Sequence, residues 1–165
     1  MAELRTQSKF LDKSKIEELL RSKRDGVLSL TDGQSTYGVP LAYMSYHADT
    51  LYLGMNPSGR KYDYFKKCKN VCFTVYQTFQ SSGDPQRMGW WSIVLDGELF
   101  QITDPEEIKA IAEMMDKQGM FPPGLKEKFL GVILKNPSKS NFFKMKITRF
   151  GGKELPEYRP EDEVK

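Results

Sequence analysis

The chain has 165 residues and a mass of 19.0 kDa, which suits a single domain over residues 1–165 and leaves little room for a second one. Hydrophobic residues make up 39% and charged residues 28%, so the disordered and fibrous classes of protein are excluded. The net charge of +3 is too small for the concentrated basic face of a nucleic-acid-binding protein, so no nucleic acid is expected as a partner.

The same counts restrict the chemistry of the chain. One histidine, His47, excludes a multi-histidine metal site, and two cysteines are too few for a disulfide framework or an iron–sulfur cluster. No nucleophile elbow, phosphate-binding glycine loop or dinucleotide fingerprint is present. Any chemistry would therefore be supplied by a bound cofactor.

The sequence shows neither a membrane-spanning segment nor a secretion signal. The longest nearly unbroken apolar run, residues 90–95, is far shorter than the ~20 residues of a membrane span. The first ten residues lack the apolar core of a secretion signal, and the two cysteines suit a reducing compartment. We therefore expect a cytoplasmic protein without a membrane partner.

A first helix is predicted near the start of the chain. Ser14 and Glu17 have the spacing of a capping box, and apolar residues follow at helical spacing. We expect this helix to run over residues 14–24 and to end near Gly26.

Three strands joined by tight turns are expected next, over residues 26–30, 36–46 and 51–55. Asp32 and Gly33 form a strong hairpin signal between the first two strands. Pro40 lies inside the second strand and cannot donate to a ladder, so this strand is expected at an edge or a bulge.

The second half of the chain is expected to contain a helix over 58–67, strands over 71–76 and 90–103, helices starting at Asp104 and near Leu125, and a strand over 141–150 ended by Gly151 and Gly152. The core is expected to span residues 14–153. Residues 154–165 are charged and contain proline, so we expect them to form a flexible or draped tail. About six strands with hairpin-like connections and three or four short helices predict a mainly β, antiparallel barrel with helices on its flanks.

One local pattern suits an anion. A strand ends in a glycine-containing loop, and the next helix begins with Arg60 and Lys61 side by side. The unpaired backbone N–H groups of a helix start, together with two cations, are suited to a phosphate. The alternative interpretation is a solvated basic helix face.

Three further features have two interpretations each. Trp90 and Trp91 either contact a planar ligand or a second subunit, or place one ring in the core while the other shields a barrel end. Cys68 and Cys72 are interpreted as buried free thiols rather than a redox pair. His47 lies in a predicted turn and is expected at the surface.

Four segments, in order and spacing, resemble the pyridoxamine-phosphate-oxidase-like split-barrel flavoproteins, and within them the nitroimidazole-resistance branch. The segments are residues 26–46, 50–75, 90–107 and 142–154. The resemblance spans residues 14–153 and implies a six-stranded split barrel that forms a homodimer, with FMN bound at the subunit interface.

The resemblance also implies the residues that hold FMN. They are backbone groups of Val39, Pro40, Leu41 and Ala42 along the ring and ribityl chain, Gly54 and Met55 in the following loop, Arg60 and Lys61 at the phosphate, Ser92 at the ring or ribityl chain, and Trp91 as a cover over the cofactor or dimer seam.

The implied activity is that of an FMN-dependent oxidoreductase, which moves hydride or electrons from a reduced donor to a small acceptor. No side chain is required as an acid or base for hydride arrival at the flavin, so no catalytic residue is assigned. Gly54 stands where nitroimidazole-resistance relatives often have histidine, and the C-terminal segment lacks the histidine of true pyridoxamine-phosphate oxidases. A non-catalytic flavin carrier and a deazaflavin-dependent reductase are the alternatives.

Overall fold

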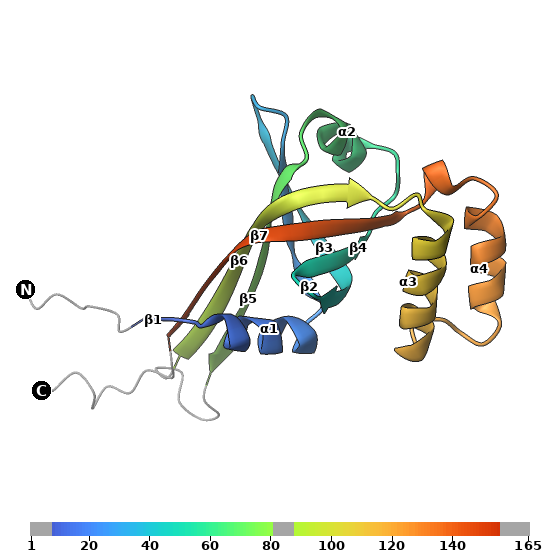
Figure 1. The fold of residues 1–165 in the computed structure, drawn as a ribbon. Helices are drawn as coiled ribbons and strands as arrows, with labels where there is room; N and C mark the ends of the chain where they lie inside the picture. The colour runs from blue at the N-terminus through green and yellow to red at the C-terminus, as the bar shows by residue number, and fades with distance from the viewer. Residues whose placement is uncertain (1–7, 81–87, 156–165) are drawn as a thin grey trace, which may run out of the picture.

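The computed structural model describes residues 8–80 and 88–155, and its secondary-structure elements alternate short helices with long strands (Figure 1). In chain order they are β1 Lys9–Phe10, α1 Lys13–Ser22, β2 Asp25–Thr31, β3 Thr36–His47, β4 Thr50–Gly54, α2 Arg60–Lys67, β5 Asn70–Gln80, β6 Met88–Gln101, α3 Pro105–Lys117, α4 Leu125–Ile133, the 3-10 turn Pro137–Lys139 and β7 Phe142–Leu155.

Six strands form a closed antiparallel barrel in the order β7-β4-β3-β2-β5-β6, and pairing of β6 with β7 closes it. The short strand β1 pairs with the end of β7 and was not expected from the sequence. The prediction of a six-stranded antiparallel barrel with flanking helices is confirmed. In Figure 1, α2 and α1 lie at opposite ends of the barrel, and α3 and α4 lie beside it.

Strand β3 changes partner along its length. Residues 36–42 pair with β2, and residues 43–47 pair with β4. A bulge between Tyr43 and Ser45 marks the change, and the guanidinium of Arg24 donates a hydrogen bond to the carbonyl of Met44 at this bulge. Within the described residues, the other edge of 36–42 therefore has no strand partner, which accommodates Pro40 as predicted.

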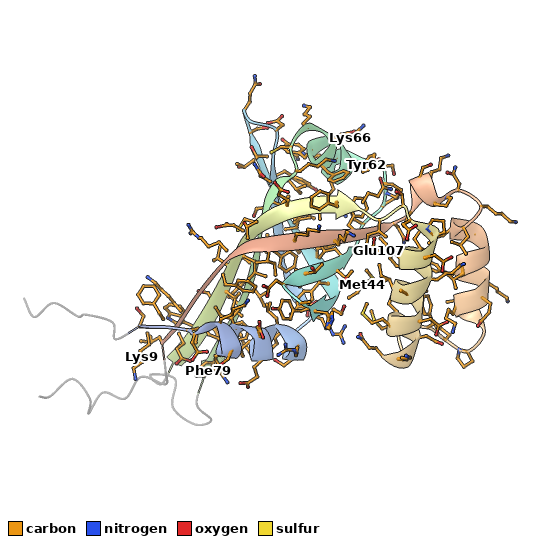
Figure 2. The ribbon with its side chains drawn as sticks, in the orientation of Figure 1. Lys9, Met44, Tyr62, Lys66, Phe79 and Glu107 are labelled. Carbon is orange, nitrogen blue, oxygen red and sulfur yellow. The ribbon has the colours of Figure 1, made fainter. Side chains whose placement is uncertain are left out.

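Two apolar clusters hold the elements together. The larger cluster fills the barrel and receives Ile16 and Leu20 from α1 and Phe65 from α2. The smaller cluster lies between the barrel and the pair α3 and α4. Lys144 of β7 reaches both carboxylate oxygens of Glu107 on α3 at 2.6 and 2.8 Å, and Figure 2 shows Glu107 on the side of α3 that faces β7.

The first helix begins earlier than predicted, because its N-cap is Asp12 rather than Ser14. The Asp12 carboxylate accepts hydrogen bonds from the backbone N–H of Lys15 and from the Ser14 hydroxyl, both at 2.8 Å. The helix ends at Ser22, before the predicted end, because β2 already begins at Asp25.

The last strand is longer than predicted, because Gly151 and Gly152 continue it. They lie opposite Val94 and Ile93 of β6. A Cβ on Gly152 would lie 3.0 Å from the Ile16 side chain, so glycine lets α1 pack closely on the strand. Glu154 and Leu155 belong to β7, and the rest of the predicted tail lies outside the described residues. Most of the predicted loop over 80–89 also lies outside them.

No helix in the described ranges, 8–80 and 88–155, combines the length and the apolar character that crossing a membrane requires.

The close approach of β6 to β7 at Gly97 predicts that two glycine-to-alanine variants differ in stability. Gly97→Ala is expected to lower the free energy of unfolding by about 1–3 kcal/mol. The added Cβ would lie 2.2 Å from the carbonyl oxygen of Lys146. Gly54→Ala is the matched control, since nothing lies within 4 Å of a Cβ there, and a change within about 0.5 kcal/mol is expected. Urea unfolding followed by tryptophan fluorescence measures both, and equal stabilities would contradict the close contact.

Candidate functional site

The segment from β4 to α2 has the geometry of an anion site. Helix α2 begins at Arg60 rather than at the predicted residue 58, because Gly59 adopts a φ of 78°, which is outside the helical region. Gly59 is the N-cap, and no side chain caps the helix. The first backbone N–H groups of α2 therefore keep their hydrogen-bonding capacity at the positive end of the helix dipole.

The two cations at this helix start differ from their neighbours on the same helix. Lys66 pairs with Asp63 at 3.0 Å, and Lys67 pairs with Asp32 at 3.4 Å. Neither Arg60 nor Lys61 forms an ion pair with a carboxylate in the described part of the chain. The pair thus has unneutralised positive charge, which favours the anion-site interpretation over a basic face balanced by local acids.

The guanidinium of Arg60 lies on aromatic rings. Its Cζ is 4.3 Å from the centroid of Tyr37 on β3 and 5.7 Å from that of Tyr64 on α2. The hydroxyl of Tyr64 is 2.7 Å from that of Ser35 in the β2–β3 turn, within hydrogen-bonding distance. The turn, β3 and α2 therefore meet around Arg60.

Helix α2 is held on the barrel by the aromatic side chains on its inner face. Phe65 is buried, and its ring lies 5.2 Å from that of Phe143 on β7. Tyr62, which Figure 2 shows between α2 and the barrel, donates from its hydroxyl to the side-chain oxygen of Gln101 at 3.2 Å. These contacts hold the helix start, and with it Arg60 and Lys61, in a defined place at the barrel end.

The predicted positions on β3 alternate between two environments. Val39 and Leu41 are half-buried and pack against the barrel core, whereas Pro40 and Ala42 are exposed. All four lie on the half of β3 whose outer edge has no strand partner among the described residues. Backbone groups at this edge are therefore available to a ligand.

Gly54 and Met55 lie where β4 ends, close to the start of β7. Gly54 has open space at the position of a Cβ, and Met55 is buried. The backbone N–H of Met55 donates to the carbonyl of Asn141 at 2.8 Å. The side-chain oxygen of Asn141 is buried and accepts no hydrogen bond from the described residues, so this region holds one unused buried acceptor.

Trp91 and Ser92 are not brought to Arg60 and Lys61 within one chain. Both lie on β6, which β5 and β2 separate from β3 in the strand order. Trp91 is 7% exposed and belongs to the barrel core, whereas Trp90 and Ser92 are half-buried on the other face of the strand.

The remaining candidates lie outside this site. Cys68 and Cys72 are free thiols as expected, but both are half-buried rather than buried, and burial raises the pKa of Cys72. His47 is exposed, as predicted. A pocket between α1, β3 and the end of α3 contains Arg21 and Arg24, but Glu17 already pairs with Arg21, and Gln118 with Arg24.

Sequence reasoning missed Tyr37, Tyr64 and Asn141. The tyrosines fit an ordinary strand and an ordinary amphipathic helix, and their meeting at Arg60 depends on the packing of α2 over β3. The helical spacing of Arg60 and Tyr64 is the one signal that the sequence contained. Nothing in the sequence linked Asn141 to Met55.

The family of the chain follows from its sequence match. Residues 12–153 match the pyridoxamine 5'-phosphate oxidase family, and the chain belongs to this family. The resemblance stated from the sequence is thereby confirmed. No curated protein matches the chain.

Solved structures share the fold. A FAD-binding protein from Mesorhizobium loti is 24% identical with a TM-score of 0.65, and the match covers 90% of this chain and 98% of that one. A putative 5-nitroimidazole antibiotic resistance protein from Bacteroides thetaiotaomicron is 21% identical with a TM-score of 0.67, covering 90% and 87%. The FAD-binding protein from Mycobacterium smegmatis is 14% identical with a TM-score of 0.59, covering 92% and 100%. At these identities the likeness is one of fold.

The turn that carries Ser35 predicts a pH-dependent stability. The Asp32 carboxylate accepts from the backbone N–H of Ser35 at 2.7 Å and of Gln34 at 3.1 Å, which holds its pKa well below the usual range. A carboxyl with a lowered pKa stabilises the fold above its unfolded-state pKa of about 3.9 and loses this effect as the pH falls toward its folded-state pKa.

Asp32→Asn is therefore expected to lower the melting temperature at pH 7, and the difference from the wild type should shrink below about pH 4. Thermal unfolding between pH 3 and 7 measures this. Asp63→Asn is the control, because the Asp63 carboxylate pairs with exposed Lys66 on the same helix. A difference for Asp32→Asn that does not change with pH would contradict the prediction.

Proposed function

We propose that the protein binds FMN and uses it as a flavin-dependent oxidoreductase. The observation that carries the proposal is the pair Arg60 and Lys61, without carboxylate partners in the described residues, at the uncapped start of α2 in a member of this family. A dianionic phosphate monoester matches two cations and several free backbone N–H groups. The proteins of similar fold that are named as FAD-binding support a flavin as the ligand class.

The surroundings of the pair fit a flavin nucleotide. Gly54 leaves open space beside the end of β4, and the free edge of residues 36–42 offers backbone groups. The buried side-chain oxygen of Asn141, next to Met55, can accept a hydrogen bond from an N–H or O–H group of a ligand. Polar groups, open space at Gly54 and two cations thus lie around one end of the barrel.

In this proposal a bound flavin supplies the redox chemistry, and the chain supplies binding and orientation. Arg60 and Lys61 hold the phosphate, Val39, Pro40, Leu41 and Ala42 offer backbone contacts, and Gly54 and Met55 border the site. No side chain is proposed as an acid or a base.

A homodimer would complete the site. Five uncharged residues lie in register across the outer face of the barrel, namely Pro40, Val27, Thr74, Val94 and Gly151. Val94 is 39% exposed and Tyr76, in the next row, is 66% exposed. Burial of such a face between two copies is favourable. It would bring Ser92 and Trp90 of one subunit, with Trp91 packed behind them, toward the β3 edge of the other.

The spectrum of the purified protein tests the cofactor. We expect flavin absorption near ~450 nm and release of FMN on denaturation. Mass spectrometry of the released molecule distinguishes FMN from FAD and from a deazaflavin. Turnover with a nicotinamide donor and a nitro or quinone acceptor distinguishes an enzyme from a flavin carrier. A colourless protein that does not bind added FMN would overturn the proposal.

The phosphate site predicts the effect of a double substitution. Arg60→Ala with Lys61→Ala is expected to weaken FMN binding about 100-fold or more, or about 3 kcal/mol, because the phosphate loses two charged partners. Titration of FMN fluorescence measures the affinity. Lys66→Ala with Lys109→Ala is the charge-matched control, since both lysines are exposed and paired one turn away on their own helices. Equal affinity of the two double variants would place the phosphate elsewhere.

The dimer predicts the effect of a charge on the outer face. Val94→Asp is expected to convert the dimer to a monomer, because the carboxylate would be buried without a partner between the subunits. Light scattering coupled to size exclusion measures the mass. Val132→Asp on α4, where valine is 71% exposed, is the control and should leave the mass unchanged. A wild-type protein that is already monomeric would contradict the proposed dimer.

A further inference from the structure

Arg60 has a long side chain at the first position of α2, where solvent would leave it many rotamers. A phosphate-binding guanidinium is more effective when its fork is already oriented. The structure gives it such an orientation, because its Cζ lies 4.3 Å from the ring centroid of Tyr37. A cation–π contact with a ring face needs no hydrogen bond from the guanidinium, so its N–H groups stay available for a bidentate contact.

Tyr37 and Tyr64 form one unit around this side chain, which we call the tyrosine clamp. Their ring centroids are 5.5 Å apart at an interplanar angle of 39°, and the Cζ of Arg60 lies 5.7 Å from the ring of Tyr64. Tyr37 belongs to β3, and Tyr64 belongs to α2 together with Arg60. The clamp therefore joins β3 to α2.

The clamp is itself held from the β2–β3 turn. The hydroxyl groups of Tyr64 and Ser35 are 2.7 Å apart, and the Ser35 hydroxyl donates to the Asp32 carboxylate at 3.0 Å. Lys67 of α2 contacts the same carboxylate at 3.4 Å. The turn therefore fixes the ring of Tyr64 through two hydrogen bonds in series.

We propose that Tyr37, supported by Tyr64, is a positioning residue that orients the Arg60 guanidinium toward the phosphate group of the bound nucleotide. This inference rests on the proposed function and adds to it the origin of the preference for a phosphorylated flavin. The clamp raises affinity for the phosphate end of the ligand and leaves affinity for the flavin ring unchanged.

A purely structural role for Tyr37 makes a different prediction. Tyr37 is half-buried and packs against the barrel core, so its removal could loosen β3. Such loosening would weaken the binding of every flavin, with or without a phosphate. Riboflavin, which has the ring and ribityl chain of FMN but no phosphate, separates the two roles.

The experiment measures the dissociation constants of FMN and riboflavin for the full chain and its variants. Tyr37→Leu is expected to weaken FMN binding about tenfold, which is within the range for loss of a cation–π contact, and to leave riboflavin binding within about twofold. Tyr37→Phe keeps the ring face and is expected to bind FMN like the wild type. Tyr52→Leu is the matched control, because Tyr52 is also half-buried but packs on the smaller apolar cluster. It should leave the ratio of the two dissociation constants unchanged.

A second arm tests whether Tyr37 acts through Arg60. In an Arg60→Ala background, Tyr37→Leu is expected to have no further effect on FMN affinity, because the guanidinium that it orients is gone. A full tenfold effect in that background would overturn the proposal, as would equal weakening of FMN and riboflavin by Tyr37→Leu. FMN binding that is indifferent to Tyr37 overturns the clamp alone, whereas a wild-type chain that binds neither flavin overturns the proposed function together with it.

Discussion

The change of partner by β3 is the constraint on which the candidate site depends. One continuous strand pairs with β2 over residues 36–42 and with β4 over 43–47, and the bulge at Met44 makes the transition possible. The guanidinium of Arg24 donates a hydrogen bond to the Met44 carbonyl at the bulge, so this backbone group has a partner. Over the described residues, the result is a closed barrel in which residues 36–42 of β3 keep one edge without a strand partner.

Helix α2 converts that edge into a site with a charged end. Tyr62 and Phe65 of this helix pack on Phe143 of β7, and Phe65 is buried, so the first turn of α2 is held at the barrel end. The N-cap is a glycine and leaves backbone donors free, which would weaken an isolated helix. Packing of the apolar side of α2 offsets this loss, and the cations at its start remain without carboxylate partners in the described residues.

The outer face of the barrel gives a physical reason for expecting two copies. Inward residues such as Leu28, Phe73 and Leu95 are fully buried, and the outward residues between them form the uncharged row from Pro40 to Gly151. Ion pairs occur on this face toward one end, where Arg149 contacts Asp96. Because the row begins at the free edge of β3, a subunit contact and a ligand site would share the same strands.

The sequence by itself determined the features that depend on a few neighbouring residues. The turn at Asp32 and Gly33, the helix start at Asp104 and Pro105, and the adjacency of Arg60 and Lys61 follow from local turn and capping chemistry. Local chemistry gave the wrong N-cap for the first helix, because Ser14 and Asp12 could both accept hydrogen bonds there and the structure uses Asp12. The tertiary structure alone decided that β3 has a free edge, that Gly151 and Gly152 continue β7, and that Tyr37 lies against Arg60. These features join residues far apart in the chain, and only the packing of strands and helices into one core brings such residues together.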